Sequence, residues 1–245
     1  MALRSTISTP AGKRRYVRRL FATIADRYDF ITRFLSYGQD QRWKRRVLAL
    51  AQVRPGDRVL DLAAGTGDLA LGAAATARRV VALDVTHRML QLARARAAAM
   101  HGGAQRRCHF VTGDMGALPF AAGDVDVVTT GYGLRNVPVL TDAIREVHRV
   151  LAPGGRLVSL DFNRPGNPIV RQAYWTYLTI VGSGLGLVLH GDPNTYRYIP
   201  ESIRLYPGAE AVGQLLRAEG FSDVQVIPVL FGFMAIHVAV KRAAV

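Results

Sequence analysis

A chain of 245 residues, 49% of them apolar, can bury one substantial core, so we expect a single folded unit and exclude a fibrous or disordered protein. Its 32 basic residues outnumber 18 acidic ones, and the net charge of +14 favours an anionic partner such as a lipid surface or a nucleic acid. Cys108 is the only cysteine, which excludes a disulfide within the chain, and the six histidines lack ligand spacing, so no metal site is expected.

The positive charge is concentrated in residues 1–50, which hold twelve Lys or Arg and three Asp. Within this stretch, apolar residues recur at helical spacing with arginines around them: Leu20, Phe21, Ile24, Tyr28 and Ile31, flanked by Arg15, Arg18, Arg19 and Arg27. The pattern predicts a basic amphipathic helix. It indicates either a helix at a lipid surface or a lid packed over a cofactor, and the two readings are compatible.

No apolar segment of signal-peptide length follows the first charges, so we expect no signal peptide. Residues 1–20 are rich in Arg, Ser and Thr and free of acids, which is also the composition of a transit peptide. The uncharged stretch 172–189 has about the length of a membrane span, but glycines at 182, 184 and 186 argue against a spanning helix.

Five short apolar runs alternate with helical patterns in the middle of the chain: 57–63, 79–85, 108–114, 125–132 and 155–162. Thr86 is placed to cap one helix, and a second helix over 139–151 is ended by Pro153 and Gly154. Two further runs, 224–230 and 234–242, indicate strands joined by a tight turn. The sequence therefore predicts an α/β fold with a doubly wound, mostly parallel, seven-stranded sheet and a C-terminal antiparallel strand.

We expect three regions in this unit. Residues 1–50 form a basic helical cap, residues 51–245 form the main domain, and a helical insertion lies at about 165–205. The insertion is uncharged and glycine-rich over most of its length.

The first run ends in LDLAAGTGDLA, a glycine turn that leads into a helix near Asp68. Gly65, Gly67 and Ala70 fit the dinucleotide pattern G-x-G-x-x-G/A. Asp84 ends the second run, where a carboxylate can hold the two hydroxyls of a ribose. These features alone suit NAD as well as other nucleotides.

Two further acids favour S-adenosylmethionine over NAD. Asp61 would repel a pyrophosphate but attract the ammonium and sulfonium charges of S-adenosylmethionine, and Asp114 with Met115 suits an adenine ring. Aspartates at strand ends also cap helices and turns, so each one has a structural reading. The predicted residues for S-adenosylmethionine and its product S-adenosylhomocysteine are Asp61, Ala63, Gly65, Thr66, Gly67, Asp84, Val85, Met89, Asp114, Met115 and Gly131.

Several motifs along nearly the whole chain resemble one family, the C-methyltransferases of ubiquinone and menaquinone biosynthesis, which have the class I methyltransferase fold. They are YDFITRFLSYGQDQRWKR (28–45), VLDLAAGTGD (59–68), GYGLRNV (131–137), YRYIPESIRLYP (196–207) and GFMAIHVAVK (232–241). The chain departs from the family at Ala64, where Gly or Cys is usual, and over 183–194, which is less polar than the family's version.

The resemblance implies methyl transfer to a ring carbon of a polyprenylated quinol, either demethylmenaquinol or the benzoquinol precursor of ubiquinone, or both. A quinol carbon attacks the methyl group only after a neighbouring hydroxyl has lost its proton, so the site must stabilise an oxyanion. We expect Arg135 and Asn136 to donate to this oxygen, and Glu201, or Tyr196 through water, to take the proton, with His237 as the next candidate. Each has a structural alternative: a surface ion pair for Arg135, a salt bridge to Arg197 or Arg204 for Glu201, and a core position for His237.

The partners implied are a lipid-soluble quinol and a membrane surface reached through the basic N-terminal helix, with residues 175–189 along the isoprenoid tail or packed as a core helix. We expect a cytoplasmic protein bound peripherally to the inner membrane, with the mitochondrial matrix as the alternative. A homodimer and a quinone-biosynthesis complex stay open. A soluble phenol or RNA is the alternative acceptor and a NAD-linked reductase the alternative enzyme, but no aromatic and basic residues interleave on a strand as nucleic-acid binding would favour.

Overall fold

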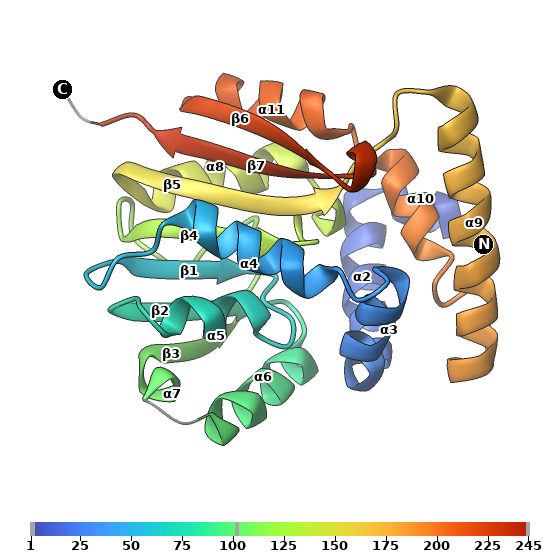
Figure 1. The fold of residues 1–245 in the computed structure, drawn as a ribbon, viewed down its shortest axis with the longest axis horizontal. Helices are drawn as coiled ribbons and strands as arrows, with labels where there is room; N and C mark the ends of the chain where they lie inside the picture. Colours follow the sequence, from blue (N-terminus) through green and yellow to red (C-terminus); the bar gives the residue numbers. More distant parts are fainter. Residues whose placement is uncertain (1–2, 101–102, 244–245) are drawn as a thin grey trace.

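A computed structural model describes residues 3–100 and 103–243, and these form one seven-stranded sheet in the order β3-β2-β1-β4-β5-β7-β6 (Figure 1). Every neighbouring pair is parallel except the two pairs that β7 makes, with β5 and with β6. The strands are β1 (Arg58–Leu62), β2 (Arg79–Asp84), β3 (Cys108–Thr112), β4 (Val125–Gly131), β5 (Leu151–Phe162), β6 (Phe221–Val229) and β7 (Met234–Lys241). The predicted fold class is confirmed.

Helices cover both faces of this sheet, which is why its central strands are apolar without alternation. On one face α4 (Asp40–Ala51) and α5 (Asp68–Ala74) pack over β1 and β4, and α6 (His87–Ala99) packs on β2 and β3. On the other face lie α8 (Leu140–Val150) and α11 (Ala209–Ala218). A short helix, α7 (Ala104–Arg107), leads into β3.

A third group of helices lies beyond the carboxyl ends of the parallel strands (Figure 1). It comprises α1 (Leu3–Ile7), α2 (Pro10–Ile24), η1 (Ala25–Arg27), α3 (Tyr28–Leu35), α9 (Pro168–His190) and α10 (Tyr198–Leu205). The N-terminal helices and the insertion share one apolar cluster, which includes Val17, Leu20, Ile24, Tyr196 and Tyr198. The two regions therefore form one helical layer above the sheet.

Close packing explains two of the glycines in α9. A Cβ added at Gly186 would lie 2.5 Å from the carbonyl oxygen of Asp192, and one added at Gly182 would lie 3.3 Å from the backbone of Tyr196. Glycine thus lets the segment after α9 fold back against the helix. Gly184, by contrast, is exposed and has open space around it.

Several element boundaries differ from expectation. The predicted amphipathic helix is divided into α2 and α3 by η1, and β6 begins at Phe221, three residues earlier than predicted. Helix α8 ends at Val150 and β5 begins at Leu151, four residues earlier than predicted, because Leu151 already pairs with Val125 before an irregularity in the ladder. Helix α4 lies within the first fifty residues but packs on the sheet, with Trp43 and Val47 in its core. Among the residues described, no helix is both long and apolar enough to cross a membrane.

Candidate active site

A cleft of about 700 Å³, open mouth included, lies at the carboxyl ends of β1 to β4. The loops after the strands supply its floor, and α2 covers it with Arg14, Val17 and Phe21. Eight of the predicted cofactor residues line it: Ala63, Gly65, Asp84, Val85, Met89, Asp114, Met115 and Gly131.

Asp84 anchors the glycine turn to the second strand. Its Oδ2 accepts from the Gly65 amide at 2.9 Å, and its Oδ1 accepts from the Thr86 amide at 2.7 Å. Burial raises the pKa of Asp84, although these two amide bonds oppose the rise. Ala63 and Gly65 both have positive φ, 51° and 56°, which bends the loop sharply between β1 and α5.

Asp114 follows β3 and faces the lid. Its Oδ1 accepts from the Gly116 amide at 2.9 Å, and its Oδ2 lies 3.1 Å from Arg14 Nε of α2. Because Asp114 and Met115 both line the cleft, this ion pair joins the lid helix to the predicted adenine position.

Asp61 lies in a smaller polar pocket beside the cleft, together with Thr66. Its Oδ1 accepts from Thr129 Oγ1 at 2.8 Å and its Oδ2 accepts from the Ala70 amide at 3.0 Å. Burial raises the pKa of Asp61 to about 7 despite these two bonds. The carboxyl is therefore close to half protonated at neutral pH, and a bound cation would favour its ionised form.

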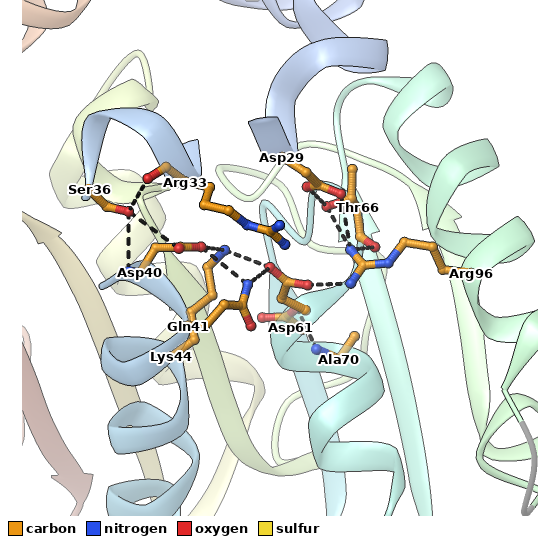
Figure 2. A network of polar contacts seen from close by, with 11 residues as sticks. Asp29, Arg33, Ser36, Asp40, Gln41, Lys44, Asp61, Thr66, Ala70 and Arg96 are labelled. Atoms are coloured by element: carbon orange, nitrogen blue, oxygen red, sulfur yellow. Dashed lines mark hydrogen bonds and ion pairs between the residues drawn. The ribbon is translucent and has the colours of Figure 1, made fainter. Parts of the chain in front are cut away.

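A polar network borders this pocket and joins α3 and α4 to α5 and α6 (Figure 2). Buried Lys44 Nζ lies 3.2 Å from Asp40 Oδ2 and 2.7 Å from Asp68 Oδ2. Arg96 lies 2.6 Å from the other oxygen of Asp68 and donates to Thr66 Oγ1 at 3.0 Å. Burial alone would raise the pKa of Asp68, but Lys44 and Arg96 hold it at about 2.

An apolar cavity of about 930 Å³ lies between α2, α3, α9 and the segment 195–199. It shares Phe21, Tyr28 and Tyr132 with the cofactor cleft, so the two spaces meet at these rings. Most of the wall is aliphatic or aromatic, including Leu20, Ile24, Ile31, Leu35, Tyr174, Tyr177, Leu178 and Met234. The shape and lining suit a large apolar molecule held beside the cleft.

Arg135 is the one arginine in the described wall of this cavity. It lies in η2 (Leu134–Asn136), is 6% exposed, donates to the Tyr132 carbonyl at 2.8 Å, and lies 3.5 Å from Asp161. Its guanidinium also sits 4.7 Å from the centre of the Phe162 ring. Its Nε is buried and finds no partner among the residues described, so a donor is free for a ligand.

Comparison with known proteins identifies the chain at the family level. The family model described as the ubiE/COQ5 methyltransferase family matches residues 9–241. The chain belongs to the ubiE/COQ5 methyltransferase family.

Two relatives and one solved structure illustrate the match. The ubiquinone/menaquinone biosynthesis C-methyltransferase of Ectopseudomonas mendocina is 39% identical over 228 residues, which cover 92% of this chain and 88% of its own. The demethylmenaquinone methyltransferase of Thermus thermophilus is 43% identical over 221 residues, which cover 89% of this chain and 98% of its own. A methyltransferase structure from Aquifex aeolicus shares the fold, with a TM-score of 0.57 at 16% identity, covering 80% of this chain and 88% of that one.

S-adenosylmethionine is the methyl donor of this family member, and the cleft fits it. Asp84 and Asp114 line the cleft, Asp61 lines the polar pocket beside it, and the buried Thr86 Oγ1 on the wall of the cleft has no partner in the described part of the chain. Ten of the eleven predicted cofactor residues line the cleft or its polar pocket. Gly67 lines neither of the two; it begins α5 with φ 89° and packs near Ala93.

The structure separates the five predicted catalytic residues. Arg135 and Tyr196 line the apolar cavity, and Asn136 lines the cofactor cleft. Asn136 is tightly held, because its amide donates to the Tyr132 carbonyl at 2.8 Å and its Oδ1 accepts from Tyr198 Oη at 2.9 Å. Tyr196 Oη lies 2.8 Å from His190 Nε2 of α9, and burial raises the pKa of Tyr196 to about 12.

Glu201 and His237 are not brought to either space within the described residues. Glu201 forms a salt bridge with Arg204 one helical turn away, which is one of the two salt bridges expected if its role is structural. His237 is 1% exposed on β7, where its Nε2 lies 2.9 Å from the Ala209 carbonyl oxygen, and burial lowers its pKa. Glu201 Oε2 is buried without a partner among the residues described, and the proton-accepting roles of Glu201 and His237 stay predictions. The ion pair of Arg135 is buried and is not a surface pair.

The predicted amphipathic helix is a lid, and its apolar side is not at the surface. Val17, Leu20 and Ile24 are buried in the helical layer, and Phe21 and Tyr28 line the cleft and the cavity. The basic side, which carries Arg15, Arg18 and Arg19, faces solvent. Folding has buried the apolar stripe, and binding of this helix to a lipid surface stays a prediction.

Sequence reasoning missed the roles of Tyr28, Lys44 and Lys13. Tyr28 borders the cleft, the polar pocket and the apolar cavity, but in the sequence it is only one member of the apolar stripe. Lys44 was counted only as one of many cations. Burial, with the nearby Arg135 charge, lowers the pKa of Lys13 to about 8, and Asp161 partly opposes this. No rule of residue spacing would have identified these three residues, because they lie on α2, α3 and α4, which come together only in the tertiary structure.

Proposed function

We propose that this protein transfers a methyl group from S-adenosylmethionine to a ring carbon of a polyprenylated quinol, demethylmenaquinol or the benzoquinol precursor of ubiquinone. The observation that carries the proposal is the junction of the cofactor cleft with an apolar cavity at Phe21, Tyr28 and Tyr132, beside a buried arginine that has a free donor. The names of the relatives from Ectopseudomonas and Thermus indicate the same class of acceptor.

The cofactor, when bound, supplies an electrophilic methyl group on a sulfonium. In this assignment Asp84 holds the ribose hydroxyls, and Asp114 and Met115 hold the adenine. Asp61 faces the ammonium group, and Lys44, the only cation among the described residues of the polar pocket, faces the carboxylate. The pocket thus offers both charges that the amino-acid end of the cofactor requires.

Arg135 has the chemistry to stabilise the phenolate form of the quinol. Asp161 and the Tyr132 carbonyl hold its orientation, which leaves Nε to donate to the oxyanion. The apolar lining of the cavity excludes water and strengthens this interaction. Asn136 positions Tyr198 and the 132–136 turn, because both the nitrogen and the oxygen of its side-chain amide already form hydrogen bonds.

Tyr196 and His190 form the proton path that the geometry favours. A tyrosine with a pKa of about 12 does not hold a negative charge, but it passes a proton on. The quinol hydroxyl gives its proton, directly or through water, to Tyr196 Oη, while the Tyr196 proton moves to His190 Nε2 at 2.8 Å. Once the ring carbon carried the methyl group, its C–H proton would be lost and the ring oxygen would be protonated again, so that one proton is released to solvent overall. Burial lowers the pKa of His190, so its imidazole is neutral and able to accept.

We place the reaction at the cytoplasmic surface of the inner membrane, because a polyprenyl quinol dissolves in lipid and exposed arginines of α2 attract anionic headgroups. Self-association and a complex with other quinone-biosynthesis enzymes remain predictions.

The direct test is a methylation assay with the purified protein, S-adenosylmethionine and each reduced quinol in detergent, followed by mass spectrometry. We expect one added methyl group on carbon in at least one quinol. Arg135→Gln should lose at least about a hundredfold in turnover while still binding S-adenosylhomocysteine. Tyr196→Phe should be slowed more at pH 7 than at pH 9, where more quinol ionises unaided. Methylation of a soluble phenol or of RNA in place of both quinols would refute the proposal.

A further inference from the structure

The elements that border the apolar cavity expose several large apolar side chains, and seven of them form the set considered below. They are Phe30 and Phe34 of α3, Tyr37 just after it, Ile180, Leu187 and Val188 of α9, and Phe231 of η3 (Leu230–Gly232). We call this set the apolar rim. Figure 1 shows that α3, α9 and the β6–β7 turn lie at the same end of the molecule, beyond the carboxyl ends of the parallel strands.

The apolar rim is continuous with the cavity wall. Leu35 and Tyr37 on the α3 side, Tyr177 on α9 and Leu230 in η3 all line the cavity, and each has a rim residue near it in sequence. Tyr37 and Tyr177 also touch, with their hydroxyls hydrogen-bonded and their ring centres 6.5 Å apart. An apolar molecule leaving the cavity on this side would pass directly onto the rim.

The tip of the β6–β7 turn is held in a costly conformation. Leu230 and Phe231 have φ of 48° and 53°, a region in which Asn and Gly are preferred and large side chains are uncommon. Phe231 is 98% exposed, so packing within the chain does not compensate for this. A turn with positive φ angles that leaves a phenylalanine side chain exposed at its tip indicates that a partner outside the chain contacts this side chain.

The charge around the rim is positive. The two acids nearest α3 are already paired with cations of the main domain, Asp26 with Arg88 at 2.5 Å and Asp29 with Arg96 at 3.5 Å. Exposed arginines of the same helical layer form no ion pair with any residue described: Arg15, Arg18 and Arg19 on α2, Arg27 in η1 and Arg33 on α3. An apolar patch in a helical layer that also carries unpaired arginines matches the headgroup region of an anionic bilayer.

We propose that the apolar rim is the membrane-docking surface of this protein, with its aromatic tips among the lipid headgroups and the mouth of the cavity open to the acyl chains. The proposal rests on the proposed function in so far as the substrate dissolves in lipid. It replaces the amphipathic stripe of α2, which is buried, as the part that enters the bilayer, and leaves the arginines as the electrostatic part.

Three substitutions test the surface without threatening the fold. Phe231→Asn places a residue that favours positive φ in the turn, so the variant should be at least as stable as the natural protein. Phe30→Gln and Phe34→Gln keep good helix formers at exposed positions. Within the described residues, none of these three side chains lines the cleft or the cavity. Met100→Gln, at an exposed methionine after α6, is the matched control.

The measurement is co-sedimentation of the full chain with vesicles of phosphatidylcholine and phosphatidylglycerol. We expect Phe231→Asn and the Phe30→Gln, Phe34→Gln pair each to weaken partitioning about tenfold, and Met100→Gln to leave it unchanged. Phe231→Trp should show fluorescence quenching by brominated lipids. Equal binding of all variants, absence of binding, or a self-association that Phe231→Asn abolishes would overturn the proposal, the last because a second copy would then cover the rim.

Turnover separates this proposal from the proposed function. The rim variants should methylate a short-tailed quinol in detergent at the natural rate and lose activity only towards a long-tailed quinol in vesicles. If the protein docks through the rim but methylates no quinol in any assay, the docking surface stands and the proposed function fails. If the protein methylates quinols but the rim variants bind vesicles normally, the proposed function stands and the docking surface fails.

Discussion

At the residue scale, the site depends on buried charges whose ionisation is set by their neighbours. Asp61 and Asp68 are both buried near the polar pocket, yet their pKa values are about 7 and about 2. Burial raises both, but Asp68 is paired with Lys44 and Arg96 whereas Asp61 accepts only neutral donors. Asp61 is thus the carboxylate prepared to receive a cation from a ligand.

Cofactor binding should therefore release a proton near neutral pH. The free protein holds a proton on Asp61 below about pH 7, and an ammonium group beside it lowers that pKa, so affinity should rise as pH increases through about 7. Calorimetry of S-adenosylhomocysteine binding at pH 6.5, in buffers with different ionisation enthalpies, measures this release directly. Asp61→Asn should release no proton. Binding heats that do not depend on the buffer would contradict the assignment.

Lys44 should make the protein prefer ligands that carry the carboxylate of the cofactor over ligands that lack it. The natural protein should bind S-adenosylmethionine at least about tenfold more tightly than its decarboxylated analogue, because the buried ammonium faces only the first ligand's carboxylate. Lys44→Met should reduce this ratio towards one. Because each ratio is measured within a single variant, any general loss of stability from unpairing Asp68 cancels. An unchanged ratio would assign Lys44 to the network in Figure 2 alone.

At the element scale, the packing of α9 decides how the cavity is built. The helix crosses over the segment 192–196 so closely that a Cβ at position 186 would overlap a backbone oxygen and one at 182 would make a tight contact, whereas one at 184 would meet open space. This segment carries Tyr196, and the neighbouring α9 end carries His190, so the fit between the two elements also places the proposed proton path.

The glycines of α9 give a matched pair of substitutions. Gly186→Ala brings a Cβ to within 2.5 Å of a backbone oxygen and should destabilise the protein by at least about 1 kcal/mol. Gly184→Ala meets open space and should stabilise it by up to about 1 kcal/mol through helix propensity. Thermal or urea unfolding of the two variants beside the natural protein measures the difference. Equal shifts would mean that the segment is not packed against α9 as described.

Elements also show the limits of periodic patterns. The helical spacing of Leu20, Ile24 and Ile31 correctly indicated an apolar face, but spacing does not say whether lipid, cofactor or protein covers that face. In the structure the insertion covers it, through Tyr196 and Tyr198 from more than 160 residues away in sequence. The proposed docking surface is instead made of short pieces of three elements with no common period.

At the scale of the whole molecule, the cofactor cleft and the apolar cavity share one wall. Most of the cavity wall is aliphatic or aromatic, so the cavity should select for an isoprenoid tail. We expect kcat/KM in detergent to rise at least about tenfold from a tailless quinol to one with two isoprene units, through burial of apolar surface. Steady-state assays across a series of tail lengths measure this. A tailless acceptor used equally well would indicate a soluble phenol as substrate.

The sequence by itself determined the sheet and the acids at its edge. Strands buried on both faces are continuous apolar runs, and parallel strands bring their carboxyl ends to one side, so Asp61, Asp84 and Asp114 could be placed together from sequence alone. Only the tertiary structure decided which polar side chains line the cleft, the polar pocket and the cavity. Among the described residues, Glu201 and His237 line none of the three, whereas Tyr28 and Lys44 border the polar pocket and His190 contacts Tyr196 of the cavity wall. No local pattern encodes the packing of the helices that carry Tyr28, Lys44 and His190. The physical reason is that the fold of each strand follows from its own residues, while the contents of a cavity depend on contacts between segments far apart in the chain.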